Sequence, residues 1–224
     1  MTVFGIAHRA GNSLAGLREA YRSAADVVEC DVHESRGRLE VRHLGTAPLP
    51  FLRDLWDHAS GSAPRLGLAE VLEADRRASR FMLDLKGTTV QTGRSVADLL
   101  HQLGHRDEVW ACGRYWPSVE RLAELPWVRP VLSARTRVGR AALEQRLSVR
   151  GRPAPYGVSV HVSLLDHGFV QLLRERVEVV MTWPVNTVAT LDRVVELGVN
   201  GIITDEPAIL TAVRGTVTDR RSAA

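Results

Sequence analysis

The feature of this sequence that most constrains its fold is a regular alternation of short apolar runs with segments that have the periodicity of amphipathic helices. Such alternation predicts a parallel sheet covered by helices. Eight strand–helix units in a chain of 224 residues favour a closed (β/α)8 TIM barrel, in the α/β class, over an open doubly wound sheet. The predicted strands are residues 2–7, 27–32, 81–86, 108–111, 128–132, 157–162, 177–182 and 199–204.

One segment interrupts the alternation. Residues 39–43 are predicted to form a short strand that returns from a turn after the second barrel strand. The following stretch, residues 44–65, lacks periodicity and contains several proline and glycine residues, so we expect an excursion with one turn of helix around residues 52–58. The sequence therefore predicts one barrel domain over residues 1–214, followed by a polar, frayed tail at residues 215–224.

Composition excludes several classes of protein. The formal net charge of +3, without a basic tract, does not favour nucleic-acid binding. Two cysteines without metal-site spacing do not make a disulfide framework. Neither a secretory leader nor an apolar run of membrane-spanning length is evident, so we expect a cytoplasmic protein without a transmembrane segment. No glycine-rich nucleotide-binding loop follows the first strand.

Acidic and basic side chains gather where the predicted strands end. His8 and Arg9 follow the first strand, and Glu29 and Asp31 lie two residues apart near the end of the second. Alternate residues of a strand share a face, so both carboxylates point the same way while Cys30 faces the outer helices. Asp84 and Lys86 repeat this spacing; Lys86 is the only lysine of the chain. In a (β/α)8 barrel the carboxyl ends of the strands form the active site.

The simplest assembly puts Glu29, Asp31 and Asp84 on one divalent ion, Mg²⁺ or Ca²⁺, because hard cations prefer oxygen ligands. Arg9 and Lys86 would hold phosphate oxygens of a small-molecule phosphodiester substrate. His8 and His43 would flank the phosphorus, one taking a proton and the other giving one.

Other residues at strand ends have simpler interpretations. Trp183 belongs to the barrel rim and is a candidate substrate contact. Asp205 is most simply a helix cap. His33 and most other histidines are expected to be hydrogen-bonded structural residues, and for His161 the two interpretations are equally good.

These segments together resemble the glycerophosphodiester phosphodiesterases, relatives of the phosphatidylinositol-specific phospholipase C barrels. The resemblance implies hydrolysis of glycerophosphodiesters to glycerol 3-phosphate and an alcohol, with a divalent metal and a histidine pair. It also implies the roles given above for His8, His43, Arg9, Lys86, Glu29, Asp31 and Asp84. The matching segments are residues 7–10, 28–32, the strand ending in His43, residues 83–86, 182–187 and 198–207.

The chain departs from the family pattern at several positions. Ala10 replaces a glycine, Leu44 replaces an aspartate, and Asp84 replaces a glutamate. The first loop and the excursion are also shorter than is usual in the family. Two alternatives stay open on these grounds: a related barrel enzyme that cleaves lysophospholipids at the phosphate, and a non-catalytic barrel that binds phosphate ligands or a partner. The oligomeric state stays open as well.

Overall fold

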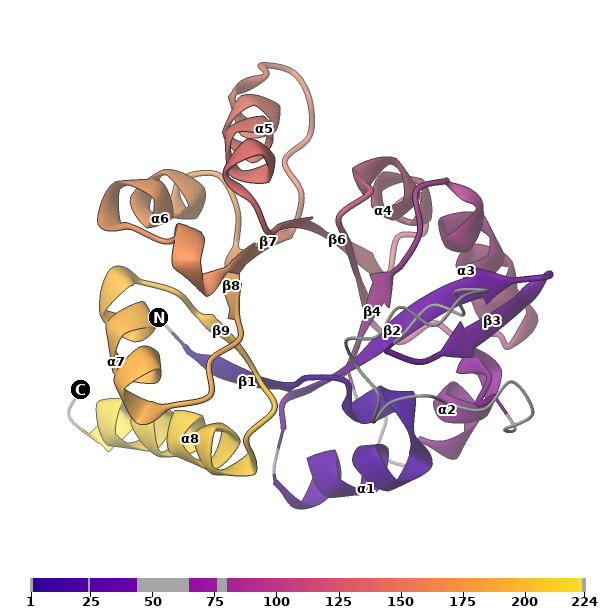
Figure 1. Ribbon diagram of the computed structural model, residues 1–224, viewed down its shortest axis with the longest axis horizontal. Helices are drawn as coiled ribbons and strands as arrows, with labels where there is room; N and C mark the ends of the chain where they lie inside the picture. Colours follow the sequence, from indigo (N-terminus) through magenta and orange to yellow (C-terminus); the bar gives the residue numbers. More distant parts are fainter. Residues whose placement is uncertain (1, 24, 44–64, 76–79, 223–224) are drawn as a thin grey trace, which may run out of the picture.

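The computed structural model describes residues 2–23, 25–43, 65–75 and 80–222, with side chains up to residue 215 (Figure 1). Eight parallel strands form a closed barrel, because β1 pairs with β2 on one side and with β9 on the other. This architecture confirms the predicted TIM barrel. The barrel strands are β1 (Phe4–Ala7), β2 (Val27–Ser35), β4 (Arg80–Leu85), β5 (Val109–Gly113), β6 (Val128–Ala134), β7 (Gly157–His161), β8 (Val179–Trp183) and β9 (Gly201–Thr204).

Helices surround the barrel (Figure 1). Several begin at a polar side chain that accepts a backbone N–H from the first turn, as Ser13, Thr136, Asp166 and Thr187 do. Two short 3-10 helices, η1 (Ala10–Asn12) and η2 (Val162–Leu164), follow β1 and β7. The described α-helices are α1 (Leu14–Arg22), α2 (Leu68–Ala74), α3 (Gln91–Gln102), α4 (Trp116–Leu122), α5 (Arg137–Ser148), α6 (His167–Arg174), α7 (Val188–Leu197) and α8 (Pro207–Ser222).

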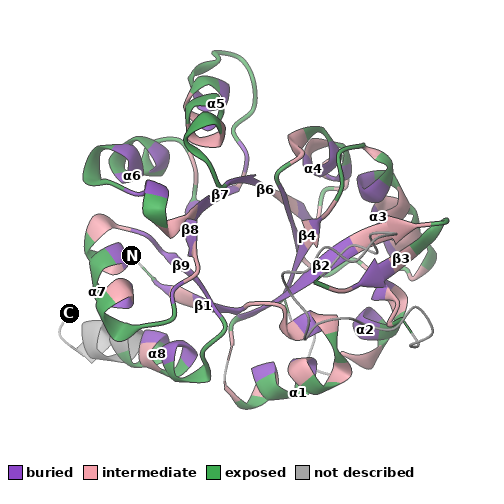
Figure 2. Ribbon diagram, viewed as in Figure 1, coloured by how far each residue is buried: buried purple, intermediate pink, exposed green. Residues whose placement is uncertain are grey.

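The strands are buried on both faces, and Figure 2 shows the inner ring almost entirely in the colour of buried residues. On β2, Val28, Cys30 and Val32 pack in the layer between barrel and helices. Val27 packs inside the barrel, and Glu29 and Asp31 follow it on that face. The predicted shared face of the two carboxylates is therefore confirmed, as is the outward direction of Cys30.

An aromatic layer closes the end of the barrel where the strands begin. The Trp110 ring packs edge-on against Phe4, with ring centroids 5.3 Å apart, and lies 5.6 Å from Tyr156. Glu108 accepts a hydrogen bond from the Trp110 indole at 3.0 Å and pairs with Arg129 at 3.0 Å. This end is filled by side chains, which leaves the opposite end for a site.

The hairpin strand β3 (Arg38–Val41) pairs antiparallel with the second half of β2, from Val32 to Ser35. β2 is therefore longer than the predicted 27–32, because its polar end is held by the hairpin. Of the excursion expected at residues 44–65, residues 44–64 lie outside the described residues, and so does the helical turn expected at residues 52–58.

The last helix is also longer than expected. A frayed tail was expected at residues 215–224, whereas the α8 backbone stays helical to Ser222. Among the described residues, no helix combines the length and the apolar character needed to cross a lipid bilayer.

Candidate active site

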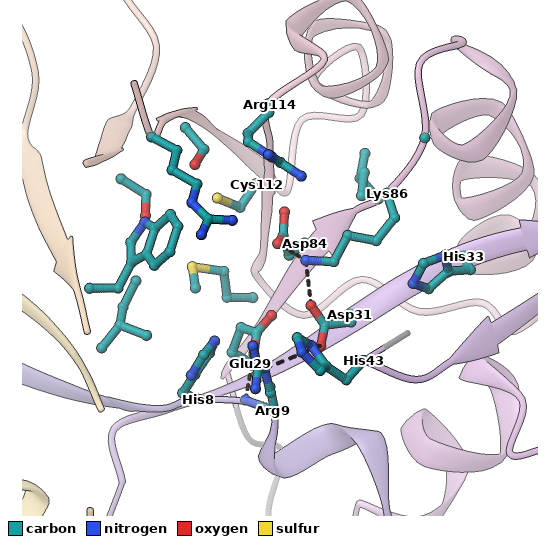
Figure 3. A pocket seen from close by; sticks show the side chains of 18 residues that line it. His8, Arg9, Glu29, Asp31, His33, His43, Asp84, Lys86, Cys112 and Arg114 are labelled. Atoms are coloured by element: carbon teal, nitrogen blue, oxygen red, sulfur yellow. Dashed lines mark hydrogen bonds and ion pairs between the residues drawn. The ribbon is translucent and has the colours of Figure 1, made fainter. Parts of the chain in front are cut away.

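A cavity of about 360 Å³ opens at the carboxyl ends of the strands (Figure 3). It collects side chains from most of the barrel strands, in agreement with the expected place of an active site in this fold. All eight of the residues that the sequence assigned to catalysis, substrate or metal lie in its wall. The wall is formed by His8, Arg9, Glu29, Asp31, His33, His43, Met82, Asp84, Leu85, Lys86, Gly87, Cys112, Arg114, Ser133, Arg135, Ser159, Trp183 and Ile203.

Three carboxylates converge in this cavity. Strand pairing sets Asp31 of β2 directly beside Asp84 of β4, and Glu29 lies one inward position deeper on β2. One oxygen from each of the three groups lies within 4.8 Å of the others. Glu29 and Asp31 are only 2% and 1% exposed. Burial raises the pKa of Glu29 well above its usual range, and the negative charges of Asp31 and Asp84 raise it further.

Lys86 supplies part of the balancing positive charge. Its ammonium group forms ion pairs with both Asp31 and Asp84. Burial alone would raise the pKa of Asp31, but the charge and hydrogen bond of Lys86 outweigh it and lower the pKa. In the same way burial would lower the pKa of Lys86, and the carboxylates raise it instead. Asp31 and Lys86 are therefore both charged at neutral pH.

Asn12 holds Asp31 in place from η1. Its side-chain amide donates to the Asp31 carboxylate at 2.7 Å, and its carbonyl oxygen accepts the Asp31 backbone N–H at 2.8 Å. The loop reaches β2 closely at Gly11, where an added Cβ would lie 2.9 Å from the Cβ of Cys30. The next residue, Ser13, caps α1.

Arg9 turns the chain out of β1 with a left-handed backbone, at φ 57°. This turn aims its backbone N–H at Glu29, 2.5 Å from Oε2. Its side-chain Nε lies 3.8 Å from Asp31 Oδ2 and is buried without a hydrogen-bond partner among the described residues. A buried donor without an acceptor suits a ligand oxygen in the cavity.

The two histidines approach the carboxylates from different elements. His43, just after β3, places Nδ1 3.5 Å from Asp31 Oδ2. His8, just after β1, places Nδ1 2.8 Å from Oδ1 of Asp205. Figure 3 shows both rings on the same side of the cavity, next to Glu29 and Arg9.

Asp205 is a site residue that the sequence interpretation missed. It was expected to cap the last helix, but its carboxylate accepts hydrogen bonds from His8 and, at 3.2 Å, from the Asn186 side-chain amide. The hydrogen bond to His8 holds the pKa of Asp205 down to about 2. The signal available in the sequence was its place directly after the last strand.

Trp183 ends β8 at the rim of the cavity, half-buried, as predicted. The His161 ring packs edge-on against it with a centroid distance of 5.0 Å, and the His161 Nδ1 lies 2.8 Å from the Ser163 hydroxyl. His161 is therefore placed as support for the tryptophan. His33, expected to be structural, also lines the cavity.

Comparison with known proteins agrees with the fold and with the family resemblance of the sequence. The family model of the glycerophosphoryl diester phosphodiesterase family matches residues 179–208, which include Trp183 and Asp205. No curated protein matches the sequence of the chain.

Several solved structures share the fold along the whole chain. A putative glycerophosphoryl diester phosphodiesterase from Silicibacter pomeroyi superposes with a TM-score of 0.77 at 16% identity, over 98% of this chain and 94% of its own. A phosphodiesterase from Oleispira antarctica, in complex with the product sn-glycerol-3-phosphate, gives a TM-score of 0.74 at 17% identity, over 95% and 96%. The glycerophosphodiester phosphodiesterase of Thermotoga maritima gives 0.69 at 18% identity, over 95% and 99%.

The resemblance found in the sequence is thereby confirmed. The chain has the barrel fold of the glycerophosphodiester phosphodiesterases and carries the sequence signature of that family in its C-terminal part.

Proposed function

We propose that the protein hydrolyses glycerophosphodiesters to glycerol 3-phosphate and an alcohol, with the help of a divalent cation. The observation that carries the proposal is the convergence of three carboxylates, two histidines and two cationic side chains on one cavity at the carboxyl end of a barrel. The phosphodiesterase of Oleispira antarctica, which has the same fold, was solved with sn-glycerol-3-phosphate. Its product is the one that the proposed reaction releases.

Glu29, Asp31 and Asp84 would hold the cation, Mg²⁺ or Ca²⁺. Three carboxylate oxygens within 4.8 Å of one another are a donor set for a hard divalent ion. The buried Glu29 carboxyl needs such an ion most, because Lys86 pairs with Asp31 and Asp84. When bound, the cation supplies stabilisation of the charge that develops on the phosphoryl oxygens.

His8 and His43 would carry the protons. In the reaction the bond between phosphorus and the oxygen of the leaving alcohol breaks. Water adds its hydroxyl group to phosphorus, and a proton is delivered to the alcohol oxygen. One histidine takes the proton of the water and the other gives a proton to the alcohol. The bond from His8 Nδ1 to Asp205 leaves Nε2 of His8 for this exchange.

Arg9 and Lys86 would bind the phosphoryl oxygens. Arg9 has a buried donor without a partner among the described residues, and a phosphate oxygen would satisfy it. Lys86 lies between two of the carboxylates, so its ammonium group would hold an oxygen of the substrate close to the cation. Trp183 would form part of the wall that the substrate contacts.

The test is hydrolysis of glycerophosphoglycerol by the purified protein, with Mg²⁺ or Ca²⁺ and with an excess of chelator. We expect turnover only with the cation, and a loss of at least about a hundredfold in kcat for His8→Ala and His43→Ala. His167→Ala removes an exposed histidine at the start of α6, outside the cavity wall, and serves as the matched control. Full turnover in chelator, or in either histidine variant, would reject the proposal.

A calorimetric titration with the cation separates the proposal from a non-catalytic barrel. A degenerate site binds no divalent ion and leaves the carboxylates to Lys86 alone. Binding of one cation that Asp84→Asn abolishes supports the metal site proposed here.

A further inference from the structure

Two arginines line the cavity on the side away from the histidines. Arg114 directly follows β5, and Arg135 directly follows β6. In the closed ring of strands, β6 lies opposite β1, from which His8 and Arg9 project. Figure 3 shows Arg114 across the cavity from these two residues. A substrate that spans the mouth of the barrel from β1 therefore ends beside the two arginines.

Among the residues that the structure describes, no carboxylate pairs with these guanidinium groups. Within the described residues, neither Arg114 nor Arg135 has a carboxylate oxygen within 4.0 Å, whereas Lys86 pairs with two. The guanidinium carbon of Arg135 lies 6.0 Å from the centroid of the Trp183 ring. Guanidinium groups hold carboxylates and phosphates through paired hydrogen bonds and keep their charge at any relevant pH.

A second hollow begins at the same arginines. Its volume is about 370 Å³, and Arg114, Ser133 and Arg135 belong to the walls of both spaces. Its outer wall includes Trp116, whose indole N–H donates to the Ser133 carbonyl at 3.0 Å and so fixes the ring. The hollow gives room for a group that extends beyond the phosphodiester.

We propose that the preferred substrates are glycerophosphodiesters whose leaving alcohol carries an anionic group of its own, a carboxylate or a phosphate, and that Arg114 and Arg135 bind this group. The inference rests on the proposed hydrolysis and adds the substrate class. The phosphodiester itself carries one negative charge, which Arg9, across the cavity, and Lys86, next to β5, would hold. A cationic alcohol such as an aminoalcohol would meet two uncompensated guanidinium groups.

The test compares four glycerophosphodiesters with leaving alcohols of matched length: 3-hydroxypropanoate, 3-hydroxypropyl phosphate, propane-1,3-diol and 3-aminopropan-1-ol. At low ionic strength we expect kcat/KM for one or both anionic substrates to exceed that for the diol by about tenfold or more, and the amine to be the poorest. The values of kcat/KM for the two anionic substrates show whether the protein prefers a carboxylate or a phosphate on the leaving alcohol. The double variant Arg114→Gln/Arg135→Gln should bring the ratio of anionic to neutral substrate close to one.

Two further variants keep the test decisive. Arg114→Lys/Arg135→Lys retains the charge and should retain part of the ratio. Arg18→Gln removes one exposed positive charge on α1, outside the cavity, and should leave the ratio as in the wild type.

A wild-type protein that hydrolyses the diol substrate at least as well as both anionic substrates overturns the inference and leaves the proposed hydrolysis in place. A preference that survives the glutamine variants overturns the role of the arginines. No turnover of any of the four, with cation present, overturns the hydrolysis and the inference together.

Discussion

At the scale of single residues, the bond between His8 and Asp205 joins the first strand–helix unit of the barrel to the last. The two residues are separated by 197 positions in the chain. The pKa of Asp205, about 2, keeps its carboxylate charged at any pH at which hydrolysis would be measured. A charged carboxylate that is hydrogen-bonded to Nδ1 fixes the orientation and the tautomer of the His8 ring. Asp205 is therefore a positioning residue for the proposed acid–base step.

We expect Asp205→Asn to lower kcat by at least about tenfold while KM changes little, because an amide can hold the ring in the wrong tautomer and cannot stabilise its protonated form. Measurement of kcat and KM across the pH range checks this, since a purely structural role would not alter the pH profile. Asp192→Asn, at an exposed position of α7, is the control. A wild-type kcat and pH profile in Asp205→Asn would contradict the assignment.

The sequence could identify the members of the site that lie on or next to strands, because strand ends in a barrel must meet. The shared face of Glu29 and Asp31, and that of Asp84 and Lys86, could be predicted from their two-residue spacing without knowledge of the tertiary structure. Asp205 and Asn12 could not be assigned in this way. Both stand next to the start of a helix, where capping is the usual use of such side chains, and their partners are fixed only when the barrel closes.

At the scale of elements, the alternation of strands and helices was predictable and several of their ends were not. The polar end of β2 continues to Ser35 because β3 pairs with it, and such pairing leaves no hydrophobic pattern in β2 itself. The sequence of residues 215–222 is mostly polar, so the last turns of α8 could not be predicted from an apolar pattern. The aromatic layer at the other end of the barrel was not predictable either, since Trp110, Phe4 and Tyr156 lie at the starts of three separate strands.

We expect Trp110→Ala to lower the free energy of unfolding by about 3–5 kcal/mol, because it removes the largest fully buried side chain among the described residues and leaves a cavity inside the barrel. Urea unfolding with a constant m-value checks the loss. Trp110→Phe keeps most of the ring volume and should cost less. An unfolding midpoint for Trp110→Ala equal to that of the wild type would show that the aromatic layer contributes little to stability.

At the scale of the whole molecule, the fold gathers buried negative charge at one end of the barrel and fills the other end with aromatic rings. Glu29 and Asp31 are almost fully buried, and the only lysine of the chain, Lys86, forms ion pairs with Asp31 and Asp84. A cation at the proposed site would therefore stabilise the native state, because the unfolded chain does not bring these carboxylates together.

We expect Mg²⁺ or Ca²⁺ to raise Tm, with a stabilisation of about 2.7 kcal/mol when the free ion is at a hundred times its Kd. Thermal unfolding with chelator and with increasing cation measures the shift. Asp84→Asn removes one ligand and should abolish most of it, while Asp192→Asn should keep it in full. Equal shifts in all three proteins would place the bound cation elsewhere.

Closure of the barrel through β1 and β9 also has a consequence for the newly synthesised protein. While the ribosome is still adding the last quarter of the polypeptide, β1 has only one neighbour and His8 lacks its carboxylate partner. His8 and the three carboxylates are synthesised early, but they lie in a closed barrel only when the final strand pairs with the first. A nascent chain that still lacks this strand therefore cannot form the bond between His8 and Asp205.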